Sequence, residues 1–262
     1  MTRYTIVEAA VEIIKEQDPL KRIELAGRTC YKSEDRITKD SAERFVSNLI
    51  RMNHTSVLEH ARVQVPDYMH DEYLSGQYPV PYGYFDRLRK SDKYPADHTN
   101  MNARDFIAIG GTLDQLKKLE LATDYLTVRF ICDRGISHEL VRERVFSFSQ
   151  ESTRYVNYKN RLLSFVRPVP FDANHYKLWE SHCDISALHY LLMLSNGAKP
   201  EEARNVLPQS VKTELVMSGL ICHWKSMLSR RLASDAHPQM RHLMNSLISH
   251  KDCPDELKTK GV

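Results

Sequence analysis

The chain has 262 residues, of which 42% are hydrophobic and 27% are charged. This balance indicates a globular protein of one large domain or two small ones and excludes a chain of low complexity throughout. The net charge of +3 is too small to indicate bulk nucleic-acid binding. No apolar run approaches the ~18 residues that a membrane helix needs. The acidic residues Glu8, Glu12 and Glu16 interrupt the start, so we expect a cytoplasmic protein without a membrane partner.

The five cysteines include no CxxC pair. An odd number without paired spacing favours free thiols in a reducing compartment over a disulfide framework. A zinc site would need distant ligands such as Cys183, Cys222 and His223, whereas structural zinc sites usually have closely paired ligands. We therefore expect no metal.

The first part of the chain predicts a strand or short helix over residues 1–17 and an amphipathic helix over 38–52. Alternation at Val63 and Val65 indicates a strand. The prolines and charged run of residues 66–100 predict an irregular excursion. We expect a single catalytic domain over 1–262, with an irregular insertion near 66–123.

The next elements follow from capping and periodicity. Thr112 and Gln115 form a capping-box pattern for a helix over 113–122. Alternation predicts a strand over 125–132, followed by a turn at Asp133-Arg134-Gly135 and a helix that begins near Ser137.

The last third of the sequence predicts helices. One begins at Pro200, another at Pro208, and a last one covers residues 234–249. Leu220, Trp224, Met227 and Leu228 recur at helical spacing as a buried stripe. The predicted order of elements, with strands and helices first and only helices at the end, indicates the α+β class.

Several nucleotide-binding and catalytic signatures are absent from the sequence: GxGxxG, GxxxxGK[ST], GxSxG and HExxH. A nucleotide would therefore be held by side chains and not by a glycine-rich loop.

Residues 138–161 combine arginines, aromatic rings and hydroxyl groups. Guanidinium groups bind phosphates and aromatic rings stack on bases, so the segment suits a nucleotide. Two alternatives are a solvated surface helix and a platform for single-stranded nucleic acid, the latter disfavoured by the modest net charge. If Arg142 and Arg144 are both helical, they point about 200° apart. They would then serve two ligands, or one ligand and a neighbouring subunit.

Five blocks of the sequence resemble the flavin-dependent thymidylate synthase family. Arg142-Glu143-Arg144, seven residues and Ser152 resemble its Arg-His-Arg-x7-Ser signature. The other blocks, in the order of the family, are Arg28–Ser33, His54–His60, Ser149–Tyr155, and Ala203–Pro208 with Arg231 and Ala236–Arg241.

This resemblance implies an enzyme that reductively methylates dUMP at C5 to dTMP. Methylene-tetrahydrofolate would supply the carbon, NADPH the electrons, and bound FAD would relay the hydride. It also implies an antiparallel sheet core with a helical C-terminal half, and a homotetramer with active sites shared between subunits.

The resemblance also assigns roles to individual residues. Arg231 and Ser152 are the expected catalytic residues; Arg231 would stabilise negative charge at the uracil edge, and Ser152 would act as a ligand because no adjacent base is evident. The expected dUMP-binding residues are Glu139, Arg142, Gln150, Glu151, Ser152, Thr153, Arg154, Arg204 and Arg231. The expected FAD-binding residues are His54, Ser56, Arg142, Glu143, Arg144 and Gln150.

The sequence departs from the family at three places. Glu143 replaces a histidine, Leu220–His223 replaces a stretch that often carries Asn and Arg near the flavin, and residues 66–123 are longer than in the shortest members. These departures keep two alternatives open. One is another C5 modification of a pyrimidine nucleotide, such as hydroxymethylation or action on UMP. The other is a non-catalytic homologue that binds a nucleotide or single-stranded nucleic acid.

Overall fold

The computed structural model describes residues 3–65 and 100–258, which form two compact units. The first unit comprises residues 1–14, 28–35 and 126–262, and the second comprises residues 15–27 and 36–125. The single catalytic domain expected over 1–262 stays a prediction.

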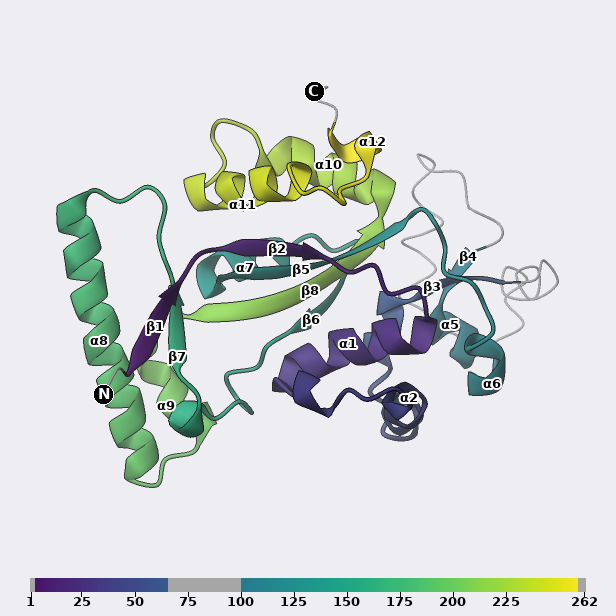
Figure 1. Cartoon of the computed structure of the whole chain (residues 1–262), viewed down its shortest axis with the longest axis horizontal. Helices are drawn as coiled ribbons and strands as arrows, with labels where there is room; N and C mark the ends of the chain where they lie inside the picture. The colour runs from purple at the N-terminus through teal and green to yellow at the C-terminus, as the bar shows by residue number, and fades with distance from the viewer. Residues whose placement is uncertain (1–2, 66–99, 259–262) are drawn as a thin grey trace. The chain divides into compact units, whose positions relative to one another are not determined.

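The first unit contains a four-stranded sheet in the order β2-β5-β8-β6 (Figure 1). The strands are β2 (Ala10–Ile13), β5 (Tyr125–Asp133), β8 (Lys212–Leu220) and β6 (Ser147–Gln150). β2 pairs antiparallel with β5, and β6 with β8. Between β5 and β8, the hydroxyls of Thr127 and Ser218 lie 2.9 Å apart. The N–H of Arg134 donates to the carbonyl of Val211 at 3.2 Å, so these two strands also run antiparallel.

Helices from the C-terminal part of the chain cover one face of this sheet (Figure 1). They are α10 (Ile221–Arg231), α11 (Pro238–Ile248) and the short α12 (Asp255–Lys258). Trp224 and Met227 of α10 are fully buried, and the indole N–H of Trp224 donates to the carbonyl of Leu126 at 3.2 Å. The helix α7 (Arg134–Leu140) follows directly after β5. Its N-cap is Asp133, whose Oδ1 accepts a hydrogen bond from the N–H of Ile136 at 2.8 Å.

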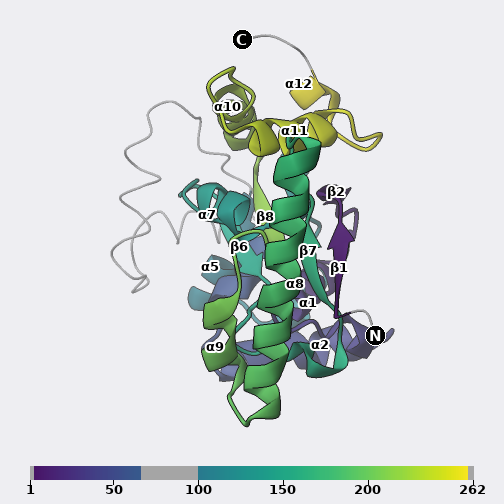
Figure 2. The ribbon, with the colours of Figure 1, turned by 90° about the vertical axis from the view of Figure 1, so that its left-hand side faces the viewer.

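A second, smaller layer of the first unit is built on β1 (Tyr4–Val7) and β7 (Leu163–Val166), which pair in parallel. The long helix α8 (Ala173–Ser195) lies beside them, as Figures 1 and 2 both show. Its residues Cys183, Ala187 and Tyr190 are buried in one cluster with Phe165 of β7. The short helices η3 (Tyr158–Asn160), α9 (Pro200–Ala203) and η4 (Arg204–Val206) complete the layer.

The second unit contains most of α1 (Pro19–Tyr31) and has its own core. Ile23, Val46, Leu58, Phe106 and Leu116 are almost fully buried in it. Its further elements are α2 (Ser41–Arg51), η2 (Thr55–His60), β3 (Arg62–Gln64), β4 (Asn100–Asn102), α5 (Ala103–Ala108) and α6 (Leu113–Leu116), while η1 (Glu34–Arg36) begins in the first unit.

Several predicted elements are confirmed. The α+β class and the antiparallel sheet are present, with β1 and β7 as an added parallel pair. The helix expected over 38–52 is α2, and the strand expected over 125–132 is β5. The Thr112 capping box is formed. Trp224, Met227 and Leu228 form the expected buried stripe, whereas Leu220 ends β8 and caps α10.

Other element predictions were wrong. The segment after Pro208 forms the strand β8 instead of a helix, because its residues are buried on both faces and give no alternating pattern. The helix after Thr112 ends at Leu116, well before residue 122. The helix α7 begins at Arg134 and ends at Leu140, so Arg142 and Arg144 lie in the following turn. The argument from a helical spacing of these two arginines therefore does not apply.

The predicted insertion is described only in part. Residues 66–99 lie outside the described residues, and residues 100–123 contain β4, α5 and α6. Within the described part of the chain, no helix is long and apolar enough to cross a membrane. The same residues include no group of three or more His, Cys, Asp or Glu that would hold a metal ion.

Candidate active site

The end of α10 meets α7 and the turn after it in a cluster of two arginines and two glutamates. Arg231 donates from Nε to Oε1 of Glu143 at 3.0 Å and from Nη1 to Oε2 of Glu139 at 3.2 Å. Its Nη2 also donates to the carbonyl of Glu139 at 3.0 Å. Arg230 donates from Nη2 to the other oxygen of Glu143 at 2.6 Å. The two positive charges of the arginines are balanced by the two negative charges of the glutamates, so the cluster has no net charge.

This cluster fixes the orientation of the Arg231 guanidinium. The side chain of Glu143 is only 10% exposed, and that of Arg231 is 21% exposed, against 55% for Arg230. Charge-assisted hydrogen bonds to two carboxylates and one carbonyl hold a planar guanidinium in one position. Of the two adjacent arginines, Arg231 is therefore the more buried and the more constrained one, and Arg230 is the more solvated one.

The predicted substrate segment begins where β6 ends. The side-chain N–H of Gln150 donates to the hydroxyl of Ser137 at 2.8 Å and to the hydroxyl of Thr213 at 3.2 Å. These bonds join the end of β6 to α7 and β8. The segment that follows is thereby anchored beside α7, on which Glu139 lies.

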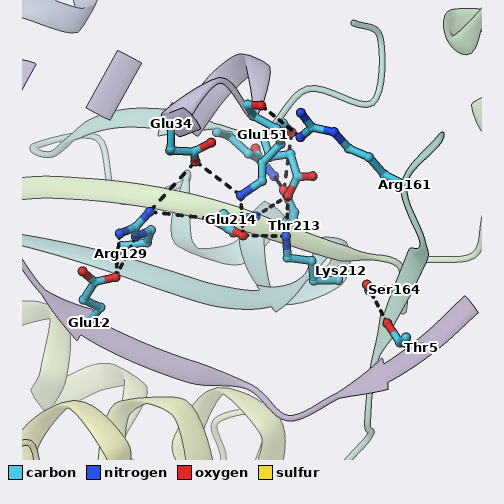
Figure 3. A network of polar contacts seen from close by, with 12 residues as sticks. Thr5, Glu12, Glu34, Arg129, Glu151, Arg161, Ser164, Lys212, Thr213 and Glu214 are labelled. Carbon is cyan, nitrogen blue, oxygen red and sulfur yellow. Dashed lines mark hydrogen bonds and ion pairs between the residues drawn. The ribbon is translucent and has the colours of Figure 1, made fainter. Parts of the chain in front are cut away.

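Glu151 is buried in a network of charged side chains (Figure 3). Its carboxylate accepts hydrogen bonds from the hydroxyl of Tyr158 at 2.6 Å and from Nζ of Lys212 at 2.9 Å. Lys212 also donates to Glu214 at 2.6 Å, and Lys32 donates to the same oxygen of Glu214 at 2.8 Å. The carboxylate of Glu151 is thus used within the protein, and its backbone N–H donates to the carbonyl of Glu214 at 2.8 Å. The structure therefore gives Glu151 a role in holding this segment in place.

Burial and charge pairing oppose each other in this network. Burial disfavours the charge of Lys212, but Glu151 and Glu214 outweigh it and raise the pKa of this lysine. Burial likewise opposes ionisation of Glu214, but Lys212 and Lys32 hold its pKa below the ordinary value. For Tyr158, burial first and Glu151 second raise the pKa, so its hydroxyl remains a donor.

The loop after Glu151 and the segment from α9 to η4 meet at a corner that carries Arg154 and Arg204, here called the cationic corner. Nε of Arg154 donates to Oε2 of Glu201 in α9 at 3.1 Å. Arg204 follows α9 directly and begins η4, and both arginines are exposed. Arg154 and Arg204, both expected to bind dUMP, therefore project from segments that are joined by an ion pair.

Ser152 and Thr153 connect the buried network to this corner. The N–H of Ser152 donates to the carbonyl of Cys30 at 3.0 Å. The hydroxyl of Ser152 accepts a hydrogen bond from the N–H of Arg154 at 3.3 Å. No base contacts this hydroxyl among the described residues, so none of them would activate it as a nucleophile. The ligand role of Ser152 stays a prediction.

Arg134 is a further cation at this corner, and the sequence did not single it out. Its Nη1 is buried and has no hydrogen-bond partner among the described residues. Burial first, and then the positive charge of Arg204, lower the pKa of Arg134. In the sequence this arginine lies between an aspartate and a glycine, a pattern that indicates only a turn.

Comparison with known proteins gives a family match that includes the residues of this site. The family model described as "Thymidylate synthase complementing protein" matches residues 12–66 and 115–254. The chain belongs to this thymidylate synthase complementing family.

Individual members of the family are distant in sequence. A flavin-dependent thymidylate synthase of Pyrococcus furiosus is 28% identical over 131 residues, which cover 48% of this chain and 54% of that protein. The chain thus spans about half the length of this relative. A flavin-dependent thymidylate synthase of Mycobacterium sp. (strain JLS) is 23% identical over 242 residues, covering 84% of this chain and 71% of that protein. The solved structure of the UMP/dUMP methylase PolB from Streptomyces cacaoi, bound with 5-Br UMP, has 16% identity and a TM-score of 0.47, covering 94% of this chain and 90% of that chain.

The residues expected to contact the flavin fall into three groups in this family member. Arg142 and Arg144 are exposed in the turn after α7, and their guanidinium groups make no ion pair with described residues. Glu143 and Gln150 use their side chains within the protein. His54 and Ser56 belong to the second unit, at the start of η2. Guanidinium groups without an ion-pair partner are suited to the diphosphate of a dinucleotide such as FAD.

Proposed function

We propose that this protein is a flavin-dependent thymidylate synthase that reductively methylates dUMP to dTMP. Methylene-tetrahydrofolate would supply the carbon and NADPH the electrons. The observation that carries the proposal is the constrained Arg231, at the position where the family resemblance places a cation against the uracil ring. Membership of the family supports the reaction class, and the cationic corner supports a phosphorylated substrate.

The proposed roles divide the substrate between two ends of the site. Arg154 and Arg204 would bind the phosphate, with Ser152 and Thr153 beside them and Glu151 holding the segment in place. Arg231 would face the uracil edge, where a fixed cation stabilises negative charge on the ring carbonyls. C5 of uracil is a weak nucleophile until electron density is moved to it. Glu139 and Glu143 would act by holding Arg231.

The proposed contacts to the cofactor lie mainly in the turn after α7. Arg142 and Arg144 would hold the diphosphate of FAD, with Arg142 also beside the nucleotide and with His54, Ser56, Glu143 and Gln150 as the further expected contacts. When bound, FAD supplies the hydride that completes the methyl group. The contribution of the protein is to bind and orient dUMP and to stabilise charge on its ring.

We also propose that the protein forms a homotetramer and is located in the cytoplasm. Residues 1–262 of each chain would form one catalytic domain. Leu178, Ile185 and Leu192 of α8 are exposed at 72%, 48% and 49%. A spacing of seven residues returns to the same helix face within about 20°, so these three side chains form one apolar stripe. A contiguous exposed apolar surface is a feature of protein interfaces. None of the five cysteines, all of which are described, forms a disulfide, which suits a reducing compartment.

A second candidate function is a different C5 modification of a pyrimidine nucleotide, by hydroxymethylation or on UMP. The contact between Glu143 and Arg231 favours it, because this carboxylate adds negative charge beside the residue assigned to the uracil edge. The electrostatics around the ring would then differ from those of a site with histidine at this position.

The first experiment is a visible absorption spectrum of the purified protein after FAD and then dUMP are added. Retained flavin with a spectral change on addition of dUMP supports one site for both molecules. The products from dUMP and from UMP, identified by mass spectrometry in the presence of methylene-tetrahydrofolate and NADPH, then separate the two candidates. A protein that binds no flavin contradicts both, and oligonucleotide binding at low salt would support the non-catalytic alternative.

A further inference from the structure

The outer face of α8 carries a repeat that the proposed reaction does not use. Figure 2 shows this helix in front of the strands of the first unit. Six exposed residues follow one another at alternating intervals of three and four positions: His175, Leu178, His182, Ile185, His189 and Leu192. These intervals are those of the a and d positions of a heptad repeat, along which two helices pack together. We call these six residues the histidine seam.

A different set of α8 residues holds the helix in its own unit. Cys183, Ala187 and Tyr190 are buried in one cluster with Phe165 of β7. The helix therefore has one stripe that faces the core and, on another face, the histidine seam. A surface helix needs only one apolar stripe to pack on its core. The histidine seam is thus available to a partner.

Charged residues are absent from the histidine seam and from the positions directly beside it. Those neighbouring positions hold uncharged residues: Trp179, Ser181, Ser186, Leu188, Met193 and Ser195. The charged residues of α8 are Lys177, Glu180 and Asp184. Asp184 is paired with Arg3 at 3.3 Å. A charged partner would lose its hydration on this face without gaining a counter-charge, so the complementary partner is an uncharged, apolar helix face.

A second copy of this chain presents such a face in a complementary order. Histidine and aliphatic residues alternate along the histidine seam, which begins with a histidine and ends with a leucine. Two copies that run in opposite directions therefore place His175 opposite Leu192 of the partner subunit. In the same register, His182 lies opposite Ile185 of the partner subunit. Each contact occurs twice, as a two-fold symmetric interface requires.

The imidazole groups are suited to this packing, because an imidazole has an apolar body and a polar tip. Nδ1 of His175 lies 2.5 Å from Oδ2 of Asp172, the N-cap residue of α8. Nε2 of His182 lies 3.3 Å from the hydroxyl of Ser186. Two of the three rings thus have a polar contact at their own helix, which leaves their apolar bodies for aliphatic side chains of a partner.

A parallel arrangement of the two helices fits the histidine seam less well. It would place each histidine against the same histidine of the other copy. Histidine is the side chain that gains a positive charge near neutral pH, so such pairs bring like charges together. A parallel arrangement also aligns the dipoles of two 23-residue helices, whereas the antiparallel arrangement opposes them.

We propose that α8 packs antiparallel against α8 of a second copy through the histidine seam, with each histidine against an aliphatic residue of the partner. This inference rests on the homotetramer of the proposed function and adds which faces meet, in which direction and in which register. It gives the three histidines a role, because they set the direction of pairing. Breaking this contact should release smaller assemblies from the tetramer.

A pair of introduced charges tests the register. Ile185→Lys places a cation opposite His182 of the partner subunit. It should raise the dissociation constant of the assembly at least about 100-fold, because a buried unpaired charge is costly. Adding His182→Glu to the same chain places a carboxylate opposite the introduced ammonium of the partner, twice in each contact. This double variant should return to within about tenfold of the unmodified dissociation constant.

Ile185→Lys combined with His189→Glu is the matched control. It carries the same added charges, and its carboxylate lies one turn from the introduced lysine on the same helix, as in the first double variant. In the antiparallel register, however, position 189 faces Leu178 of the partner subunit, so this control should stay dissociated. Analytical ultracentrifugation over a range of protein concentrations measures each assembly, and circular dichroism checks that each variant is folded.

Three outcomes contradict the inference. An Ile185→Lys protein with the size of the unmodified assembly would place this face of α8 outside any interface. Equal behaviour of the two double variants would overturn the antiparallel register. An unmodified protein that is monomeric at every concentration would exclude a second copy as the partner. The measurements contain neither flavin nor dUMP, so they separate the failure of this contact from a failure to convert dUMP to dTMP.

Discussion

Glu143 and Arg231 are joined by a hydrogen bond of 3.0 Å across 88 residues of sequence, and Arg230 binds the other oxygen of the same carboxylate. A carboxylate accepts from two guanidinium groups at once, whereas a neutral histidine has one acceptor nitrogen. The residue that departs from the family signature is therefore the one that holds the proposed catalytic arginine. This relationship makes Glu143 a positioning residue for Arg231.

Glu143→Gln tests this role because it keeps the shape and removes the charge. Charge-assisted hydrogen bonds contribute about 1.5–3 kcal/mol, so we expect kcat for dUMP to fall about 10–100-fold with a smaller change in KM. Arg231→Ala should lower kcat by about 100–1,000-fold. The double variant should fall no further than Arg231→Ala alone, because both changes act on one unit.

The control for these variants is Glu256→Gln, which alters an exposed glutamate that faces Lys225 at 3.8 Å. Its kcat should equal that of the unmodified protein. Independent, additive losses for Glu143→Gln and Arg231→Ala would show that Glu143 does not act through Arg231.

Substitutions in the cationic corner should lower the affinity of the protein for dUMP only because dUMP carries a phosphate. Arg154→Ala and Arg204→Ala should each weaken dUMP binding by about 10–100-fold, from the loss of charge-assisted hydrogen bonds. Neither change should weaken binding of deoxyuridine, which lacks the phosphate. Isothermal titration with both ligands measures the difference, and Arg51→Ala on the exposed end of α2 is the control. Equal losses for dUMP and deoxyuridine would place these arginines against another part of the substrate.

Arg134 provides a prediction about stability. Its buried Nη1 has no partner among the described residues, and the like charge of Arg204 disfavours its cation. Arg134→Met keeps the length of the side chain and removes the charge, so the free energy of unfolding of the ligand-free protein should rise by about 1 kcal/mol. Urea unfolding measures this change. A clear destabilisation would mean that the guanidinium is better satisfied than this geometry indicates.

The predictability of the fold follows from how far each element is exposed on one face. The helix α2 was predictable because one of its faces is exposed and gives a periodic pattern. The strand β5 was predictable because buried and partly buried residues alternate from Val128 to Cys132. The strand β8 was not, because seven of its nine residues are buried without interruption. A proline eight residues after Pro200 then resembled a second helix start.

The candidate site was predictable only as a set of residue types. Arg154, Arg204 and Arg231 were identified by resemblance, and their own surroundings did not distinguish them from surface arginines. The partners of Arg231 lie 88 and 92 residues away, so no local pattern indicates them. The commitment of Glu151 to Lys212 and Tyr158 was hidden for the same reason. The spacing of residues along the sequence does not show which distant side chains pair in the folded protein.

The pair of Lys212 and Glu214 predicts how stability depends on pH. The pKa of Glu214 is lowered in the folded protein, so its stabilisation is present above the unfolded value of about 4.5 and is lost as the pH falls through the folded pKa. The pKa of Lys212 is raised, so its stabilisation is present below about 10.5 and is lost as the pH rises through the folded pKa.

Glu214→Gln isolates the acidic limb of this dependence. At neutral pH it should lower the free energy of unfolding by about 3 kcal/mol, because Lys212 and Lys32 lose a buried partner. The difference from the unmodified protein should shrink as the pH falls below about 4.5. Urea unfolding at a series of pH values measures it, and a difference that is constant with pH would exclude the ionised pair as its cause.

The apolar stripe on α8 predicts where subunits meet. Ile185 is the middle residue of the three, and Ile185→Glu would bury a charge in any interface built on this face. We expect the variant to sediment as a smaller assembly than the unmodified protein, with unchanged circular dichroism because Ile185 is half exposed within one chain. Ser229→Glu adds the same charge to an exposed position on α10 and should leave the assembly intact. If active sites are shared between subunits, turnover by Ile185→Glu should fall together with the assembly and recover at higher protein concentration, because association follows mass action. An Ile185→Glu protein that keeps the size of the unmodified assembly would show that this face of α8 lies in no interface.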